Sequence, residues 1–394
     1  MITRKIFQKL VEELNNNKIL LLIWPRQVGK TTLLEQLQTQ ITTKEYFFLT
    51  LEDTTYRALL DEHPYNLFEI TGIDSKKDQI IFIDEIQYLK DPSNFLKLLY
   101  DTHKNNLKLV VSWSSSFYID QKFKDSLMGR KELYEIYTLD FEEFLEFKHE
   151  SKLKELLFVE KKIPIGYKAR IEELFLEYIT YWWYPEVVLL PTHHKKMKKL
   201  ELLSQDYIKK DIYESNISQI TTFMGILKTL ATNIGEQVNS SELASTFGIS
   251  VPTVQRYLYI MQKSYSIALV KPFWTNIRAE LTKMPKVYFF DFWLRNALIK
   301  DFTNLRERRD KWQIHENILW RELLFQYSID DIRYRRTQQQ NEVDFIIQEK
   351  KAYEAKFTQN LIKESKYKLF REKYPQIDLQ FITSDEIIET IIIK

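Results

Sequence analysis

The sequence contains no cysteine, very little glycine and no long apolar run. Without cysteine it has neither a disulfide framework nor a thiolate metal site, which suits a reducing compartment. No apolar run approaches the roughly 20 residues that cross a bilayer, and the N-terminal segment has the pattern of an amphipathic helix rather than a signal peptide. The formal net charge is only +2, so any nucleic-acid site must be a local patch. We expect a soluble, cytoplasmic protein.

Only 7 glycines occur among 394 residues, whereas average usage of about 7% predicts roughly 28. Tryptophan stands at several strand-to-loop corners, where glycine is usual because it tolerates positive φ and the close approach of a ligand. These positions are Trp24, Trp113, Trp182, Trp183 and Trp293. We hypothesise that they are glycine in the cell, in a lineage that reads UGA as glycine. The alternative is a genuine low-glycine protein.

The order of strand-like and helix-like segments predicts an α/β protein with more than one domain. Alternating segments typical of a parallel sheet are 19–23, 30–40, 46–50, 80–83, 93–103, 107–112 and 133–138. Helical periodicity follows over 140–235, a small winged-helix pattern over 236–290 and a second α/β pattern over 310–394. We predict an AAA-like P-loop domain at 1–165, a helical and winged-helix domain at 166–290, and a restriction-endonuclease-like α/β domain at 291–394.

The segment 19–34, ILLLIWPRQVGKTTLL, predicts a cradle for nucleotide phosphates. It satisfies the pattern G-x-x-x-x-G-K-[ST], except that Trp24 stands at the first glycine. In such a loop, backbone N–H groups at a helix N-terminus bind the phosphates, the lysine reaches the β- and γ-phosphates and a hydroxyl holds magnesium. We therefore expect ATP to contact Arg26, Gln27, Val28, Gly29, Lys30, Thr31 and Thr32, with Thr31 also on the metal.

Further candidates for nucleotide chemistry follow downstream. Asp84 ends an apolar strand and is expected to bind magnesium through water, while Glu85 is expected to act as the general base; the alternative is two acids at a solvated strand end. Ser115, in the run 114–116, is a candidate γ-phosphate sensor or part of a polar turn. Arg130 is a candidate phosphate contact, in its own chain or in a neighbouring subunit of a homo-oligomer, or a surface charge.

The segment 239–263 has the pattern of a helix–turn–helix. Asn239 and Ser250 are suitable N-caps, Gly248 ends the first helix, and Pro252 lies in the first turn of the second. Strands at 268–272 and 286–290 would form a wing. The outward side chains that would suit a DNA groove are Gln255, Arg256, Tyr259 and Lys263. The alternative is a protein-interaction or packing module.

Acidic residues and a lysine near the C-terminal end form a nuclease-like pattern. A hairpin of 342–347 and 352–356 would bring Asp344 beside Glu354 and Lys356, because residues two apart on a strand share a face. Two carboxylates and a lysine can hold magnesium and orient water against a phosphodiester. Glu316, or with less support Glu322, would supply another acid. Arg333, Arg335 and Arg336 are candidate phosphate-backbone contacts. The alternative is a buried ion-paired cluster in a domain that does not cut.

Seven stretches together resemble a widespread class of prokaryotic ATPases: WPRQVGKTTLL, IIFIDEIQYL, VVSWSSSFYI, LMGRKELYEIYTLDFEEF, WWYPEVV, VYFFDFWLRNAL and NEVDFII. That class joins an AAA-type P-loop module to a C-terminal domain of unknown function (the domain of unknown function 4143 class, restriction-endonuclease-like). The resemblance implies ATP binding and hydrolysis. In that family glycine stands where this sequence has Trp24, Trp113 and the pair Trp182-Trp183, as the codon hypothesis predicts.

These observations predict an ATPase that uses ATP and Mg²⁺ and acts with or on DNA. The expected catalytic residues are Glu85, Lys30, Ser115 and Arg130, and the expected metal-binding residues are Thr31 and Asp84. A second candidate metal site contains Glu316, Asp344, Glu354 and Lys356. Two alternatives remain open: a nucleotide-gated switch that binds a protein partner without turnover, and a Mg²⁺-dependent DNA nuclease that ATP regulates.

Overall fold

The structure is a computed structural model that describes residues 3–23, 29–42, 44–72, 74, 76–113, 127–181, 184–273, 283–336, 342–384 and 386–392. Five predicted positions therefore lie outside the described residues: Trp24, Arg26, Gln27, Val28 and Ser115. So do Trp182 and Trp183. The chain divides into two compact units, residues 1–139 with 184–186, and residues 140–183 with 187–394. The predicted three-domain boundaries at 165 and 290 remain a prediction.

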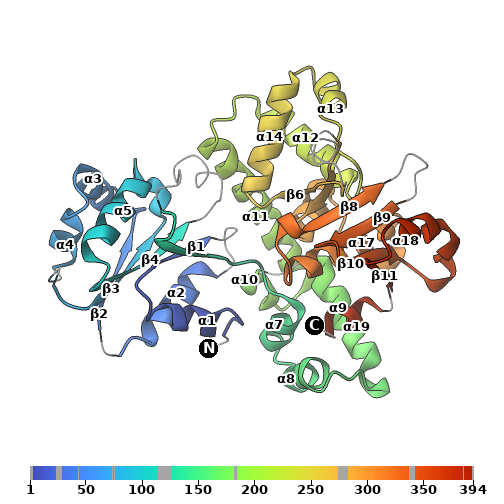
Figure 1. The fold of residues 1–394 in the computed structure, drawn as a ribbon, viewed down its shortest axis with the longest axis horizontal. Coiled ribbons are helices and arrows are strands. Elements are labelled where there is room, and N and C mark those ends of the chain that lie inside the picture. The colour runs from blue at the N-terminus through green and yellow to red at the C-terminus, as the bar shows by residue number, and fades with distance from the viewer. Residues whose placement is uncertain are drawn as a thin grey trace. The chain divides into compact units, whose positions relative to one another are not determined.

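The first unit is built on one parallel sheet with the strand order β2-β3-β4-β1-β5 (Figure 1). Its strands are β1 (Ile19–Ile23), β2 (Glu45–Thr50), β3 (Gln79–Asp84), β4 (Leu107–Trp113) and β5 (Lys131–Glu135). Every residue of β1, β3 and β4 is buried, as is usual for the inner strands of a parallel sheet that is covered on both faces. The predicted parallel α/β sheet is confirmed.

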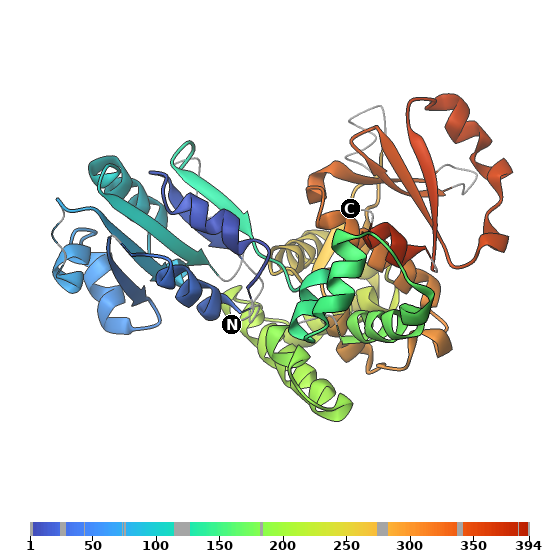
Figure 2. The same ribbon diagram turned by 90° about the horizontal axis from the view of Figure 1, so that it is seen from below.

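Helices cover both faces of this sheet. They are α1 (Phe7–Glu13), α2 (Lys30–Thr39), α3 (Thr54–Glu62), α4 (Asn66–Thr71), the 3₁₀ helix η1 (Ile86–Tyr88) and α5 (Pro92–His103). Helices α1 and α2 lie on one side and α5 on the other (Figure 1 and Figure 2). Crossover connections between parallel strands are right-handed. The connection from β1 to β2 runs across the sheet in the opposite direction to the connections from β2 to β3 and from β3 to β4, so its helix lies on the opposite face. The carboxyl ends of the strands consequently share one edge, where Gly29 and Asp84 lie.

The second unit begins with helices and a helix–turn–helix. Its first elements are α7 (Phe141–Phe147), α8 (Ser151–Lys154), the π-helical turn η2 (Glu155–Val159), η3 (Ile165–Tyr167), α9 (Lys168–Tyr181), α11 (His193–Glu214) and α12 (Ile220–Thr232). The short helix α10 (Pro185–Val188) is divided between the two units. Helices α13 (Ser240–Phe247) and α14 (Val251–Lys263) follow, then the antiparallel pair β6 (Ile267–Val270) and β7 (Lys286–Phe289). Asn239 and Ser250 cap the two helices as predicted, and Gly248 has a left-handed φ of 64° at the intervening turn.

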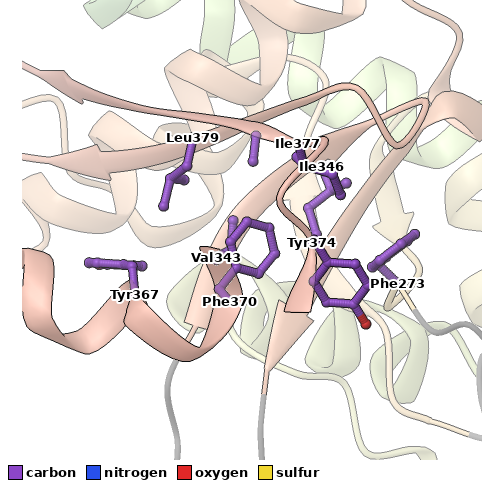
Figure 3. Packing of buried hydrophobic residues seen from close by; sticks show 9 residues of the cluster. Phe273, Val343, Ile346, Tyr367, Phe370, Tyr374, Ile377 and Leu379 are labelled. Carbon is purple, nitrogen blue, oxygen red and sulfur yellow. The ribbon is translucent and has the colours of Figure 1, made fainter. Parts of the chain in front are cut away.

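The last part of this unit contains a four-stranded mixed sheet with the order β11-β10-β9-β8. Its elements are α16 (Phe292–Ile299), η4 (Leu305–Glu307), α17 (Lys311–Leu324), η5 (Ile329–Asp331), β8 (Ile332–Arg336), β9 (Glu342–Ile347), β10 (Lys351–Lys356), η6 (Gln359–Leu361), η7 (Glu364–Tyr367), α18 (Lys368–Lys373), β11 (Asp378–Thr383) and α19 (Ile387–Ile392). An apolar cluster joins α18 to the sheet through Phe370, Val343 and Leu379 (Figure 3). The predicted C-terminal α/β layer is therefore present.

Two of the tryptophans in the codon hypothesis lie within the described residues. Trp113 ends β4 and is 0% exposed, and Trp293 lies in α16 and is 1% exposed. Neither is among the described residues with a positive φ. The backbone at these two positions therefore does not itself demand glycine, and the codon hypothesis remains a prediction to be tested on the gene.

Candidate nucleotide site and a second carboxylate cluster

Gly29 forms the corner between the P-loop and helix α2. It is the N-cap of α2 and has a φ of 88°, in the left-handed region. A Cβ at this position would lie 3.4 Å from Cγ of Pro185, in a short segment that belongs to the same compact unit. The backbone conformation favours glycine here, because L side chains rarely adopt this φ. The N–H groups of the first turn of α2, which have no partner within a helix, follow directly after this corner.

The ammonium of Lys30 lies between the two acids that end β3. Its Nζ is 3.0 Å from Oδ1 of Asp84 and also forms an ion pair with Glu85. The side chains of Lys30, Asp84 and Glu85 are 14%, 11% and 9% exposed. The sequence therefore identified Lys30 and, far from it along the chain, the adjacent acids Asp84 and Glu85, which the fold brings into contact with it. Opposite charges at this distance and degree of burial attract strongly.

Ser112, a residue that the sequence analysis did not single out, holds both acids in place. Glu85 has a left-handed backbone with a φ of 59°, and its N–H donates to Oγ of Ser112 at 2.9 Å. The Ser112 hydroxyl in turn donates to the Asp84 carboxylate, and the Gln87 side-chain amide donates to Glu85. Ser112 lies in the fully buried strand β4, beside β3.

The remaining predicted nucleotide contacts are placed differently. Thr31 and Thr32 are exposed in the first turn of α2, next to Lys30. Arg130 donates to both carboxylate oxygens of Asp101, at 2.8 and 3.1 Å. It precedes β5, whose first residue pairs with the first residue of β1, so Arg130 lies at the amino-terminal edge of the sheet. The structure thus brings Lys30, Asp84 and Glu85 together but not Arg130. Its contribution from a neighbouring subunit stays a prediction.

The donor set at this edge fits a nucleotide with magnesium. An ammonium, the N–H groups of a helix N-terminus and an exposed hydroxyl suit phosphate oxygens, and the Asp84 carboxylate suits a hard cation. The Lys30 ammonium is held at this edge by the carboxylates of Asp84 and Glu85.

A second carboxylate cluster lies in the C-terminal part of the other unit. Glu316 of α17 and Glu342 and Asp344 of β9 each offer an oxygen, and these oxygens all lie within 4.8 Å of one another. The Lys286 ammonium of β7 is 2.7 Å from Glu316 and 3.7 Å from Asp344, and it also forms an ion pair with Glu342. Burial, together with the neighbouring carboxylates, raises the pKa of Asp344 well above its usual value.

Glu354 and Lys356 extend this cluster along β10, as the hairpin pattern predicted. The N–H of Asp344 donates to Glu354 at 3.2 Å, and Lys356 forms an ion pair with Glu354. The hydroxyl of Tyr367 also donates to Glu354, at 2.7 Å. Burial raises the pKa of Glu354 in spite of the nearby Lys356 ammonium. The geometry thus brings together all four residues of the predicted second site.

Magnesium does not fit this second cluster as it stands. The oxygens that would coordinate an ion already surround the ammonium of Lys286, whose side chain is 3% exposed. Mg²⁺ requires carboxylate oxygens at about 2.0–2.1 Å in near-octahedral geometry, and the ammonium takes up the space between them. We therefore derive no metal-dependent step from this cluster.

The other candidates near this cluster have separate partners. Glu322 is 2% exposed and accepts from the hydroxyl of Tyr178 at 3.4 Å, so Glu316 is the acid from α17 that reaches the cluster. Arg335 donates to the hydroxyl of Tyr374 and Arg333 to the carbonyl of Asp330. Arg336 pairs with a cluster member, at 3.6 Å from Glu342.

Of the predicted DNA-facing residues, Gln255 and Arg256 are exposed on α14. The Arg256 guanidinium also donates to the carbonyl of Ser215 at 3.0 Å. The Lys263 ammonium lies 5.7 Å from the centre of the Tyr259 ring, a cation–π distance. On α14, the helix that would enter a DNA groove, Arg256 is therefore hydrogen-bonded to a backbone carbonyl and Lys263 lies over the ring of Tyr259.

Comparisons with known proteins agree with the fold of the first unit. Residues 16–145 match the family model described as AAA domain, and residues 172–306 match a domain of unknown function (DUF8612). The first unit thus resembles an AAA domain with the fold of P-loop ATPases, and a region similar to a domain of unknown function follows it. Among the part of the chain that the structure describes, no helix has both the length and the apolar composition needed to cross a membrane.

Three individual relatives extend this likeness over most of the chain. An uncharacterized protein of Methanocaldococcus jannaschii, MJ1544, is 26% identical over 88% of this chain and 75% of its own length. An uncharacterized protein of Haemophilus influenzae is 25% identical over 84% of this chain and 80% of its own. The solved structure of a Walker-type ATPase of Pyrococcus abyssi superposes with a TM-score of 0.50, at 16% identity, over 76% of this chain and 96% of that chain. This last likeness concerns the fold alone.

Proposed function

We propose that this protein is a cytoplasmic, magnesium-dependent ATPase that binds ATP at the carboxyl edge of the first sheet. The observation that carries the proposal is the contact of Lys30 with both Asp84 and Glu85 beside the N-terminus of α2. Positive charge, helix N–H groups and two acids then converge where strand ends meet, the usual ligand position of an open α/β sheet. Magnesium, when bound, would neutralise the charge on the phosphate oxygens.

The roles of the residues follow from their chemistry. Lys30 binds phosphate charge and, in doing so, leaves Asp84 and Glu85. Asp84 is then available to the metal together with the hydroxyl of Thr31, and Glu85 accepts a proton from the attacking water. Gln87 and Ser112 hold Glu85 in its orientation, through their hydrogen bonds to it, while Lys30 moves from the acids to the phosphates. Arg26, Gln27, Val28 and Thr32 are proposed to contact ATP, Ser115 to sense the γ-phosphate, and Arg130 to act from a neighbouring subunit of a homo-oligomer.

A Glu85→Gln substitution tests hydrolysis, because it keeps the shape of the side chain and removes the base. We expect turnover to fall by about 10²-fold or more while ATP binding is retained. The exposed Glu62, on α3 of the same unit, supplies the matched control Glu62→Gln, which should leave turnover unchanged. ATP binding without measurable turnover in wild type would instead favour a nucleotide-gated switch that recruits a protein partner without hydrolysis, and turnover that is unchanged in Glu85→Gln would show that Glu85 is not the base.

We further propose that the ATPase acts with DNA through α13 and α14. Capped helices in a helix–turn–helix arrangement and the exposed Arg256 support this. Reversing the charge of Arg256 and Lys263 to glutamate should abolish the binding of duplex DNA, whereas Lys350→Glu, at a turn outside this region, should not. DNA binding that survives the double reversal would contradict a groove-binding role for α14.

The restriction-endonuclease-like assignment, the domain of unknown function 4143 class and the nuclease alternative are kept as proposals about the C-terminal part. The mutual contacts of Glu316, Asp344 and Glu354 with lysines support a nuclease-like arrangement. The nuclease alternative predicts Mg²⁺-dependent nicking of plasmid DNA that disappears in Lys356→Ala. Nicking that persists in Lys356→Ala would have to come from a contaminant or another site.

A further inference from the structure

Lys286 is the central cation of the second carboxylate cluster, although no nuclease-like sequence pattern includes it. Its Nζ contacts Glu316 at 2.7 Å and Asp344 at 3.7 Å, and it pairs with Glu342. These are the same three residues whose oxygens are close enough together to hold a metal ion. The ammonium therefore has the same partners that a divalent cation would have.

The lysine reaches the cluster from a different supersecondary element. Lys286 is the first residue of β7, where it pairs with Val270 of β6, whereas the three acids lie on α17 and β9. The backbone at this point is also fixed by a bridge to Gln237 and by the bond from the N–H of Val287 to the carbonyl of Glu236. The backbone hydrogen bonds at the start of β7 consequently fix the position from which the Lys286 side chain reaches the carboxylates.

The surroundings of the acids leave little freedom for a second cation. The hydroxyl of Tyr288 donates to Glu316 at 2.5 Å. The N–H of Ala355 donates to Asp344 at 2.8 Å. Glu316 and Asp344 thus each keep only part of their coordination capacity, and the ammonium of Lys286 uses that part.

Counting charges leads to the same conclusion. The cluster has four carboxylates (Glu316, Glu342, Asp344 and Glu354) and three cations that pair with them (Lys286, Arg336 and Lys356), a formal balance of 3 − 4 = −1. Removing Lys286 gives 2 − 4 = −2, which one divalent ion would neutralise. Buried charge is costly unless it is compensated. Either cation can therefore compensate the acids, and the ammonium, which lies between their oxygens, takes up the space that a divalent ion would need.

We propose that Lys286 occupies the cation position of this cluster, so that the protein in this conformation is closed to divalent metal there. A metal ion enters only when the ammonium of Lys286 leaves. Metal-dependent cleavage is therefore excluded while Lys286 of β7 stays in contact with the acids. This holds even though the fold brings together the nuclease-like set Glu316, Asp344, Glu354 and Lys356. The inference is independent of ATP hydrolysis at the first site.

Mn²⁺ binding to the full chain without nucleotide tests this, with free Mn²⁺ followed by its electron paramagnetic resonance signal. Lys286→Met keeps the length of the side chain and removes its charge. We expect wild type to show no Asp344-dependent binding, Lys286→Met to gain one Mn²⁺ site with at least tenfold higher affinity than any in wild type, and Lys286→Met/Asp344→Asn to lose it. Lys356→Met, which removes the other lysine, should gain none.

The charge-balanced variant Lys286→Met/Glu342→Gln covers the case in which the single variant does not fold, because it removes one charge of each sign. It should also gain the site, through Glu316 and Asp344, and Mn²⁺ should raise its melting temperature but not that of wild type. Wild type that binds Mn²⁺ in an Asp344-dependent manner would overturn the proposal by itself. So would folded Lys286 variants that gain no site, or an equal gain in Lys356→Met.

Discussion

The hydroxyl of Ser112 accepts the backbone N–H of Glu85 at 2.9 Å and donates to the carboxylate of Asp84. One buried side chain on β4 therefore holds both acids at the end of β3. It also accepts a hydrogen bond from the backbone N–H of Glu85, whose φ of 59° is uncommon for residues other than glycine. Such backbone conformations persist only where the surroundings fix them. Ser112 is thus a positioning residue for the proposed base.

Replacing Ser112 by alanine should lower kcat by about tenfold and leave the KM for ATP within a few-fold. The reason is that Glu85 loses its backbone anchor while Lys30 and the P-loop remain, and an unsatisfied buried N–H costs about 1–3 kcal/mol. Steady-state kinetics on Ser112→Ala and Ser112→Thr measure this. The threonine variant, which keeps the hydroxyl, should recover most of kcat. A large rise in KM with unchanged kcat would contradict the positioning role.

Gly29→Ala should destabilise the first unit and weaken ATP binding. Alanine at a φ of 88° carries backbone strain of about 1–2 kcal/mol, and its Cβ would approach Pro185 at 3.4 Å. Gly129→Ala is the matched control, because Gly129 also has a positive φ, 74°, but has nothing within 4 Å of the added Cβ. Both variants should lower the melting temperature, but only Gly29→Ala should lose ATP affinity. Equal ATP affinity in the two variants would count against a role for Gly29 in the site.

Lys108 predicts a pH dependence of stability. It lies on β4, is 4% exposed and donates to the carbonyls of Asn16 and Lys18. Burial lowers the pKa of Lys108 to about 8, from an ordinary value of 10.5. Between these two values the unfolded chain binds more protons than the folded one, so this residue makes the folded state more stable as the pH rises. Below about pH 8 its buried charge is a penalty on folding.

The measurement is urea unfolding of wild type and Lys108→Met at pH 7.5, 8.5 and 9.5. The free energy of unfolding of wild type should rise relative to the variant across this range, by on the order of 1–2 kcal/mol. The comparison with the variant removes the effects of all other titrating groups. A difference that stays constant with pH, or that falls, would show that Lys108 keeps its ordinary pKa in the folded protein.

Sequencing the gene tests the hypothesis that the five tryptophan positions are encoded by UGA and read as glycine. We expect UGA codons at positions 24, 113, 182, 183 and 293, and their translation as glycine in the native host, detected by mass spectrometry of the corresponding peptides. UGG codons at these positions would end the hypothesis. Because Trp113 and Trp293 are fully buried, glycine there would also change the packing that surrounds β4 and α16, so both versions of the protein should be compared in each assay above.

The sequence predicted the parts of the fold that strong local patterns encode. β1 was predicted at its observed bounds, Ile19–Ile23, because a continuous apolar run is typical of an inner parallel strand. β5 was predicted at 133–138 but spans Lys131–Glu135, because an edge strand with no fully buried residue carries no such run. Likewise Lys30, Asp84 and Glu85 were found from motif spacing, and the fold brings them into contact as expected.

Residues that act through long-range packing escaped the sequence analysis. Ser112 acts only because β4 lies beside β3, and Lys286 only because β7 is directed at α17 and β9. Neither relationship leaves a local pattern in the sequence. The choice between Glu316 and Glu322 shows the same limit: both lie on α17, and only the orientation of the helix directs the first into the cluster and the second to Tyr178.

Equilibrium binding of labelled Mg-ATP to the purified protein tests the central claim most directly. We predict saturable binding to one site per chain, in wild type or, if Trp24 obstructs the loop, in Trp24→Gly, and its loss by at least 100-fold in Lys30→Ala made in the same background. Absence of ATP binding in both wild type and Trp24→Gly, or binding that Lys30→Ala leaves unchanged, would contradict the proposed nucleotide site.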